Sequence, residues 1–391
     1  MCKGKPYFFP LTAPKLLASF TQRIKIMRNN LYLLILSNSL KMKKVILGTA
    51  ALLCSAVTFA QSNDSDIDQN GNNHGAIVNQ IGASNISDID QDGNANKADV
   101  GQDGISNTSL VIQSDGDSDE NANHEAVVNQ DGELNDSYLF QKGDDQIAQV
   151  DQIGNNNESD TYQYGSSNLT EVWQEGDGNK ALVFQMGDAG ATEPNNQAFV
   201  TQMGRNNNAT QKQFGDQNLA TSVQNAKGSD VMQFQVGTNN EAEATQSGGV
   251  PGVSGRGFHS IIQTQFGNDN LAVADQSKNN QEAWQSQVGT NNESYVTQTE
   301  QHNDSWQTQF GSGNTSTVDQ KHSLQSINGD RGRNISATFQ MGEANTVTHM
   351  QNGLRNTAVT TQFGAMHSST INQTGAYNTA NVSQSGSVIQ N

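Results

Sequence analysis

Glutamine recurs every eleven residues along this chain, from Gln69 to Gln384. The series contains 27 glutamines, and 22 of the 26 intervals between them have this same length. Glycine usually stands two positions after each of these glutamines, and asparagine usually stands five positions after it. A short period repeated this often is the signature of a repeat architecture, in which each unit packs against its neighbours. A chain built from one repeat therefore leaves little room for a unique catalytic site.

Residues 1–60 differ in kind from the rest of the chain. They hold nine Lys and Arg residues and no Asp or Glu, and Met42-Lys43-Lys44 precedes an apolar run, Val45 to Val57, that ends at Thr58-Phe59-Ala60. A charged head, a short apolar stretch and a small-residue cleavage site are typical of a secretory signal peptide. We interpret the chain as an upstream extension (1–41) before the true start at Met42, a signal peptide (42–60), a short acidic segment (61–68) and a repeat domain (69–391).

Charge and cysteine content restrict what the mature chain can do. Cys2 and Cys54 both precede residue 61, so no disulfide can hold the repeat together. Subtracting the nine leading basic residues from 21 leaves 12 against 39 acidic residues, a net charge of −27. That charge disfavours nucleic acid and anionic membrane surfaces as partners, and we expect no membrane insertion after signal removal. The polar composition is typical of disorder, but disorder does not require glutamine at every eleventh position.

A single unit predicts a strand and a turn. In Asn179-Lys-Ala-Leu-Val-Phe-Gln185-Met-Gly187, alternate positions carry Asn, a small residue, an aliphatic residue and Gln, while the positions between them vary freely across units. Alternate residues of a strand face opposite sides, so the restrained side is inside and the variable side is outside. We expect a strand of about seven residues and a four-residue turn. Glycine near the turn start and asparagine at its exit would supply left-handed backbone.

Stacking supplies the burial that one such strand lacks, because it places Gln on Gln and Asn on Asn in side-chain amide ladders. From Gln213 onward, Gln-x-Gln pairs occur in alternate units only, and the intervening turns often lack glycine. We therefore predict an all-β, two-sheet β-solenoid of about 13 stacked rungs with amyloid-like cross-β pairing. Each 22-residue rung holds two 11-residue units, and the four longer intervals place extra residues in turns. The expected structural ladder is Gln213, Gly215, Asn218, Gln235, Gly237, Asn240, Gln265, Gly267, Asn270, Gln287, Gly289, Asn292, Gln309, Gly311 and Asn314.

The unit Ser229-x5-Gln235-x-Gly237-x2-Asn240-x-Ala242-x3-Gln246 resembles the curlin repeat, and the resemblance extends over nearly all of 61–391. It implies a secreted subunit that polymerises end to end into curli, the extracellular amyloid fibres of biofilm matrices that serve adhesion and colonisation. It also implies export from the periplasm through an outer-membrane curli pore and nucleation by a minor curlin. The chain departs from the family in having more rungs, and in having Asn at many leading positions where the repeat has Ser.

No catalytic, cofactor-binding or metal site is expected, and we predict that the chain is not an enzyme. No nucleophile elbow, phosphate loop or zinc spacing occurs. Acidic runs could hold Ca²⁺ between rungs, although a solvated acidic face is the simpler interpretation; they are Asp64/Asp66/Asp68, Asp88/Asp90/Asp92 and Asp115/Asp117/Asp119. Histidines at the asparagine position are expected to replace a ladder amide; they are His74, His124, His259 and His367. The others in the mature chain are His302, His322 and His349.

The alternative function is a monomeric β-solenoid that binds a target, as an adhesin or an ice- or carbohydrate-binding module. An ice-binding face needs a regular row of threonines. One outward column is expected to hold Thr201, Thr245, Thr264, Thr297, Thr308 and Thr361, although Asp, Phe and Lys interrupt it. A second outward stripe, Phe214, Phe266, Phe310 and Phe363, is expected to stack and shield the arc, with a fibre–fibre contact as the other interpretation.

Overall fold

The computed structural model describes residues 62–115, 123–187, 195–248, 259–321 and 333–386. The chain from Ser62 onward is one compact unit, separate from residues 1–61. The upstream extension and the signal peptide lie outside the described residues, as do Asp117, Asp119 and His322. Within the described ranges, no helix is long and apolar enough to cross a membrane.

The described residues form 27 strands in two sheets, and each strand pairs in parallel with the strand two places along the chain. The odd sheet has 14 strands: β1 (Asp64–Asn72), β3 (Ile86–Asn94), β5 (Thr108–Asp115), β7 (Asp136–Asp144), β9 (Glu158–Ser166), β11 (Lys180–Met186), β13 (Asn208–Asp216), β15 (Asp230–Thr238), β17 (His259–Asn268), β19 (Gln281–Thr290), β21 (Asp304–Ser312), β23 (Ile335–Glu343), β25 (Thr357–Ala365) and β27 (Thr379–Ser385). The even sheet has 13: β2 (Gly75–Ala83), β4 (Lys97–Ile105), β6 (Glu125–Glu133), β8 (Ile147–Asn155), β10 (Leu169–Asp177), β12 (Gln197–Arg205), β14 (Leu219–Lys227), β16 (Glu241–Ser247), β18 (Leu271–Ser277), β20 (Glu293–Thr299), β22 (Thr315–Lys321), β24 (Thr346–Leu354) and β26 (Ser368–Ala376).

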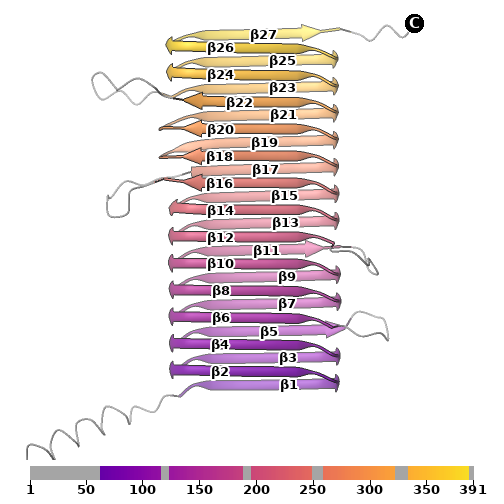
Figure 1. The fold of residues 1–391 in the computed structure, drawn as a ribbon, viewed down its shortest axis with the longest axis vertical. Coiled ribbons are helices and arrows are strands. Elements are labelled where there is room, and N and C mark those ends of the chain that lie inside the picture. Colours follow the sequence, from indigo (N-terminus) through magenta and orange to yellow (C-terminus); the bar gives the residue numbers. More distant parts are fainter. Residues whose placement is uncertain (1–61, 116–122, 188–194, 249–258, 322–332, 387–391) are drawn as a thin grey trace, which may run out of the picture. The chain divides into compact units, whose positions relative to one another are not determined.

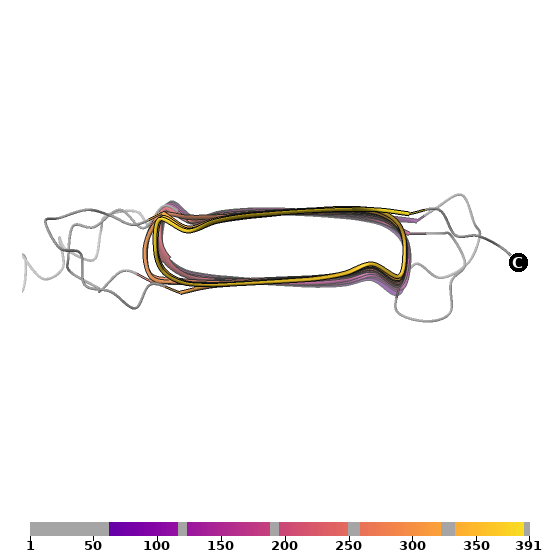
Figure 2. The same ribbon diagram turned by 90° about the horizontal axis from the view of Figure 1, so that it is seen from above.

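The predicted two-sheet solenoid is confirmed. One odd and one even strand make each rung, and the rungs stack along the long axis of this unit (Figure 1). Viewed down that axis, the rungs lie almost directly over one another as a flattened loop (Figure 2). Pairing is in register, so that Gln213 lies beside Gln235 and Gly215 beside Gly237. The repeated sequence thus becomes a set of columns of like residues.

The four longer intervals leave the register unchanged. Gln113 of β5 still pairs with Gln141 of β7, and Gln246 of β16 still pairs with Gln276 of β18. The first two intervals follow the odd strands β5 and β11, whereas the last two follow the even strands β16 and β22. Odd and even strands end at opposite edges of the rung, so the strands that precede the first two intervals and those that precede the last two end at opposite edges.

Two details of the predicted turn are wrong. Most strands have nine residues rather than seven, because the ladder continues through the glycine and one residue beyond it. The left-handed non-glycine residue is also not the buried asparagine but the residue before it. That position holds Asn239 (φ 58°) in one arc, and Leu134 or Tyr377 in others. Its side chain points away from the interior, and Asn, Asp or Gly often stands there, as in Asn156, Asp269 and Gly228. These residues adopt left-handed backbone most readily, so the signal in the sequence lies one position before the asparagine that was expected to supply it.

The interior is narrow and mostly polar. Burial alternates along each strand, with small and aliphatic residues such as Ala98, Val100 and Ile89 on the inner side. Buried Asn, Gln, Ser and Thr side chains accompany them in nearly every rung. A core of this kind buries little apolar surface, so the stability of the stack depends on how well its polar groups are paired.

Candidate functional site: amide ladders and open ends

The glutamine column forms an unbroken chain of side-chain hydrogen bonds through each sheet. Up to the last rung, every Nε2 donates to the Oε1 of the glutamine in the next rung, at 2.7–3.2 Å. The same Nε2 also reaches a carbonyl of the opposite sheet, as Gln213 does to Gln197 O at 2.9 Å. Both amide hydrogens are thereby used, which a buried amide requires. The ladder has one direction throughout, from the first rung toward the last.

A second glutamine ladder runs inside the middle of the odd sheet. Gln211 donates to Gln233 at 2.8 Å and Gln233 to Gln263 at 2.9 Å, and the series continues through Gln285 to Gln307. These side chains stand where the other odd strands carry an aliphatic residue or a threonine, as in Val183 and Thr338. The even strands opposite supply small inner residues, Ser222, Ala244 and Ala274. The Gln-x-Gln pairs are therefore a paired amide layer in a core with little apolar volume.

Asparagine and glycine depend on each other at the arcs that carry both residues, as the arc between β15 and β16 shows. The Oδ1 of Asn240 accepts both the backbone N–H (3.2 Å) and the Nδ2 (2.9 Å) of Asn270. In turn, Asn240 Nδ2 donates to the carbonyl of Gly267 at 2.7 Å. Gly267 has φ +117°, and a Cβ there would lie 2.0 Å from Gly289 O. Glycine is therefore required both for the backbone angle and for the close approach of successive rungs.

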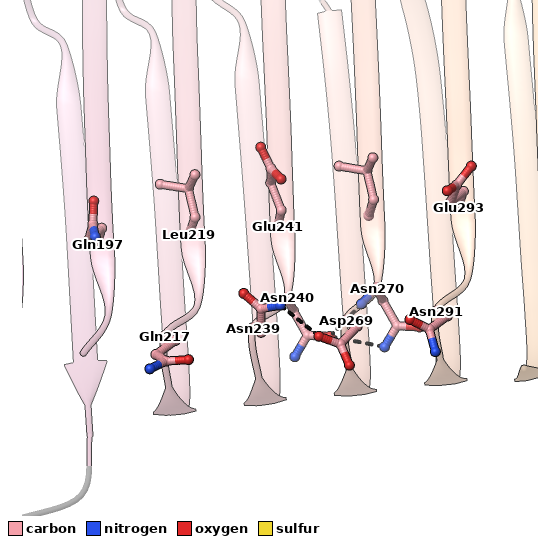
Figure 3. A pocket seen from close by; sticks show the side chains of 11 residues that line it. Gln197, Gln217, Leu219, Asn239, Asn240, Glu241, Asp269, Asn270, Asn291 and Glu293 are labelled. Carbon is pink, nitrogen blue, oxygen red and sulfur yellow. Dashed lines mark hydrogen bonds between the residues drawn. The ribbon is translucent and has the colours of Figure 1, made fainter. Parts of the chain in front are cut away.

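The fifteen residues expected to form the ladder all lie on or beside strands β13 to β22. Their glutamines join column to column, and their asparagines and glycines meet at the arcs that follow odd strands. Figure 3 shows this edge, where the asparagines line a shallow groove between the arc and the outward column of the even sheet. Asn239 Nδ2 also donates to Asp269 Oδ1, at 2.6 Å, along the rim of the groove.

Histidine takes the place of the asparagine amide at several rungs. His124 Nδ1 lies 3.3 Å from the backbone nitrogen of Gln146, which can only donate, so Nδ1 accepts and Nε2 carries the hydrogen. Nε2 faces Ser114 O at 3.2 Å. Burial lowers the pKa of His124 and of His259 from 6.5 to about 4, so both are neutral at pH 7. His74 and His367 contact the carbonyls of Asn70 and Phe363 in the same way.

One buried histidine was not anticipated as a contact residue. His349 occupies the inner aliphatic position of β24, between Val318 of β22 and Ile371 of β26. Its ring nitrogens lie 2.8 Å from the hydroxyls of Ser336 and Thr360, both on the odd sheet. Burial lowers the pKa of His349 to about 4. The signal in the sequence is a polar residue at an inner position that most even strands fill with Val or Ile. The odd strands that face it carry Ser and Thr on their inner side.

The two ends of the solenoid are open within the described residues. All nine residues of β1 are exposed, so Ile67 is 42% exposed, whereas Ile89 above it is fully buried. At the other end, the inner residues of β27 are only half-buried. The ladder direction gives the ends different chemistry. The first rung carries the Oε1 acceptors of Gln69 and Gln80 on its outer side, and the last carries the Nε2 donors of Gln373 and Gln384.

The outer face of the odd sheet carries a column of stacked aromatic rings. Ring centroids lie 5.3–5.6 Å apart in an unbroken series, Phe140, Tyr164, Phe184, Phe214, Phe234 and Phe266. A shorter series joins Phe310, Phe339 and Phe363 at 5.8 and 5.6 Å. The four phenylalanines of the expected stripe thus stack with rings of the neighbouring outward column rather than directly with one another. Such tilted pairs stabilise adjacent strands.

The expected threonine column is wrong. Thr201, Thr245 and Thr297 lie on even strands, whereas Thr264, Thr308 and Thr361 lie on odd strands, so the six residues are divided between opposite faces. The eleven-residue period does not distinguish the faces, because each rung contains two units. No single flat row of these threonines exists for an ice surface to contact.

The acidic residues of the first rungs lie on the outer face. Asp66 and Asp68 of β1 stand beside Asp88 and Asp90 of β3. The pKa of Asp88 is raised, first by partial burial and then by the carboxylates of Asp66 and Asp90. Among the residues that the structure describes, no group of three or more His, Cys, Asp or Glu side chains is arranged to hold a metal ion.

Comparison with known families gives one match. A family model described as curlin associated repeat matches residues 154–187, 342–375 and 353–386. Each matched segment begins and ends at an arc glycine and spans three eleven-residue units, for example from Gly154 to Gly187. A comparison with curated proteins finds no match.

Proposed function

Because this chain belongs to the curlin repeat family, we propose that it is a secreted structural subunit that polymerises end to end into extracellular curli-type amyloid fibres. The observation that carries the proposal is the pair of open ends. Each end presents unpaired parallel strands together with the outermost members of the glutamine columns. Uncovered strand edges are templates for pairing with another chain, and amide ladders continue across such pairs.

The remaining parts of the proposal come from the family resemblance. They are cleavage after Ala60, passage through the periplasm and an outer-membrane curli pore, and nucleation by a minor curlin. The fibres would then serve the biofilm matrix, cell adhesion and surface colonisation. In this role the chain acts by assembly and not by catalysis, which agrees with the structural character of the family.

The test is assembly of purified residues 61–391, followed by thioflavin T fluorescence and by fibre diffraction of the product. A sigmoidal rise with meridional spacing of about 4.7 Å and equatorial spacing of about 10 Å is expected. A β-rich monomer that does not polymerise, even when seeded with preformed curli, would contradict the proposal. That outcome would favour the monomeric binding module.

Charge gives a second measurement on the same samples. The net charge of −27 on residues 61–391 opposes the approach of two copies, and salt screens that repulsion over about 10 Å at 0.1 M ionic strength. The lag before fluorescence rises should therefore shorten as salt concentration increases. A lag that is the same at low and high ionic strength would show that charge does not control assembly.

A further inference from the structure

Within the described residues, 62–386, the solenoid begins and ends on the same sheet. Strands β1 and β27 both belong to the odd sheet, which has 14 strands against 13 in the even sheet. Two strands make a rung, so 27 strands make thirteen and a half rungs. At each end the odd sheet therefore extends half a rung beyond the even sheet, as the topmost strand β27 in Figure 1 illustrates. This half rung restricts how two copies can stack.

Stacking without rotation leaves a defect. If the next copy has the same orientation, its β1 lies on β27, and one strand is missing from the even sheet between β26 and the next β2. A half-turn about the long axis removes the defect. It reverses both the side and the direction of each strand, so β1 of the next copy lies parallel on β26, and β2 lies parallel on β27.

The inner residues match in the rotated arrangement. The inner residues of β1 are Ser65, Ile67 and Gln69, and those of β26 are Ser369, Ile371 and Gln373. Equally, the inner residues of β2 are Ala76, Val78 and Gln80, and those of β27 are Ala380, Val382 and Gln384. Both new pairs would thus place identical side chains on each other. Without rotation, Ala380 would lie on Ser65 and Val382 on Ile67.

The match requires the two sheets to exchange patterns along the chain. In the first rungs the odd strands carry the inner serine, as in Ser87, and the even strands carry the alanine, as in Ala98. In the last rung the serine is on the even strand β26, and the alanine is on the odd strand β27. A half-turn junction makes use of this exchange, because it brings the serine strand of one copy onto the serine strand of the next and the alanine strand onto the alanine strand.

The direction of the ladders selects head-to-tail contact. Glutamine Nε2 donors face outward at the last rung, and glutamine Oε1 acceptors face outward at the first rung. The last rung of one copy can therefore continue the ladder only onto the first rung of another copy. The asparagine column has the reverse direction, since Asn378 donates back to Asn356 Oδ1 at 3.1 Å. Contact between two like ends would oppose donor to donor or acceptor to acceptor in both columns.

We propose that successive subunits join head to tail with a half-turn about the fibre axis, so that β26 and β27 of one copy pair with β1 and β2 of the next. This inference rests on the proposed end-to-end assembly. It specifies a rise of roughly 65 Å per subunit, from thirteen and a half rungs of about 4.8 Å. It also specifies a rotation of half a turn between neighbours, in addition to the small twist of the stack itself.

Engineered disulfides test which strands meet. Asp68 in β1, Asn79 in β2, Asn372 in β26 and Ser383 in β27 all occupy the outward position before the glutamine, and all are exposed. Neighbouring strands place such Cα atoms about 4.8 Å apart, within the range a disulfide spans. The repeat domain, residues 61–391, is used because it forms a compact unit separate from the leading segment and contains no cysteine, so that only the added thiols react.

Under the half-turn, D68C/N372C and N79C/S383C should form intermolecular disulfides in fibres under mild oxidation. Most of the protein should then run as covalent multimers on non-reducing gels. The matched control D68C/S383C should stay almost entirely monomeric, because its two sites lie on opposite sheets. Cross-linking of the control, or its absence from the first two pairs, overturns the half-turn.

Electron microscopy of the unmodified fibre separates this inference from the proposed function. Helical reconstruction should relate each subunit to the next by a rotation close to half a turn. A fibre whose subunits are related by translation with almost no rotation would retain the proposed function and overturn the half-turn. If residues 61–391 form no fibre with or without seeds, both proposals fail.

Discussion

The odd and even sheets share the ladder glutamine column, yet they differ in part of their interior, at their arcs and on their outer faces. Every described arc after the odd strands β13 to β25 has glycine two positions after the ladder glutamine, whereas several arcs after even strands carry Ala226, Lys278 or Glu300 there. From Met232 to Ser385, the odd sheet has no charged residue in three outward columns, those three positions before, one position before and one position after the ladder glutamine. The same columns of the even sheet contain Glu243, Asp275, Asp319 and Lys321.

This difference shows what the ladder does and does not require. The ladder glutamine must recur in every rung because each of its amides bonds to its copy above and below, whereas the other interior positions vary within small and medium-sized residues. Outward side chains need only be compatible with a β-strand, so their charge and polarity can vary with the surroundings of the fibre. The odd sheet combines tight glycine arcs, a second glutamine ladder and stacked rings, and we expect it to be less tolerant of substitution than the even sheet.

The largest difference is expected at the arcs. Gly267→Ala would force a Cβ to within 2.0 Å of Gly289 O at a residue with φ +117°, and should cost about 3 kcal/mol or more. The even-sheet counterpart, Ala226→Gly, should cost only about 1 kcal/mol, because it adds backbone freedom without a clash. Urea unfolding of freshly prepared chain measures both. Equal losses would mean that the two arcs are not different.

The second ladder should be nearly as sensitive. Gln263→Leu removes the side-chain bonds to Gln233 and Gln285 and leaves buried carbonyls, including Ala272 O, without their donor. We expect a loss of about 3 kcal/mol in unfolding free energy. The control Thr245→Val, on the exposed side of the neighbouring even strand, should change stability by about 0.5 kcal/mol or less. A tolerated Gln263→Leu would show that the amide layer is dispensable.

Acidification should weaken the contact that His349 makes between the sheets. Its pKa is lowered by burial from 6.5 to about 4, so the unfolded chain binds the proton first. The stability it contributes is therefore complete above pH 6.5 and declines between pH 6.5 and 4, by up to about 3 kcal/mol. His349→Val should flatten this part of the stability profile from pH 7 to 4.5. If the variant keeps the full pH dependence, other groups are responsible.

The smallest difference is expected on the outer faces. Phe234→Thr removes ring contacts of 5.6 Å with both Phe214 and Phe266, and should cost about 1 kcal/mol. Val223→Thr, in the same outward column of the even sheet, should cost about half as much. Thermal unfolding under matched conditions compares the two variants. A larger effect at Val223 would contradict the stabilising role assigned to the ring stack.

The sequence predicted the glutamine columns because a buried side-chain amide needs hydrogen-bond partners and the glutamine of the next rung supplies one, which requires Gln to recur in every unit. The left-handed residue was placed one position too late, at the buried asparagine, because both positions are rich in asparagine, as at Asn239 and Asn240. The threonines were assigned to one column because the eleven-residue period is the same in both sheets and does not show to which sheet a unit belongs. His349 was missed because its partners, Ser336 and Thr360, are adjacent only once the two sheets face each other.

The odd strand number also determines what a fibre would show to its surroundings. From β14 onward the outer face of the odd sheet is aromatic and largely uncharged, whereas that of the even sheet carries charges, so subunits stacked without rotation would build a ribbon with two unlike sides. With a half-turn at each junction, each side of the ribbon instead presents the two faces in alternating bands, repeating every roughly 130 Å, or two subunits. Both sides of the ribbon would then offer the same striped surface to a cell, a mineral or another fibre.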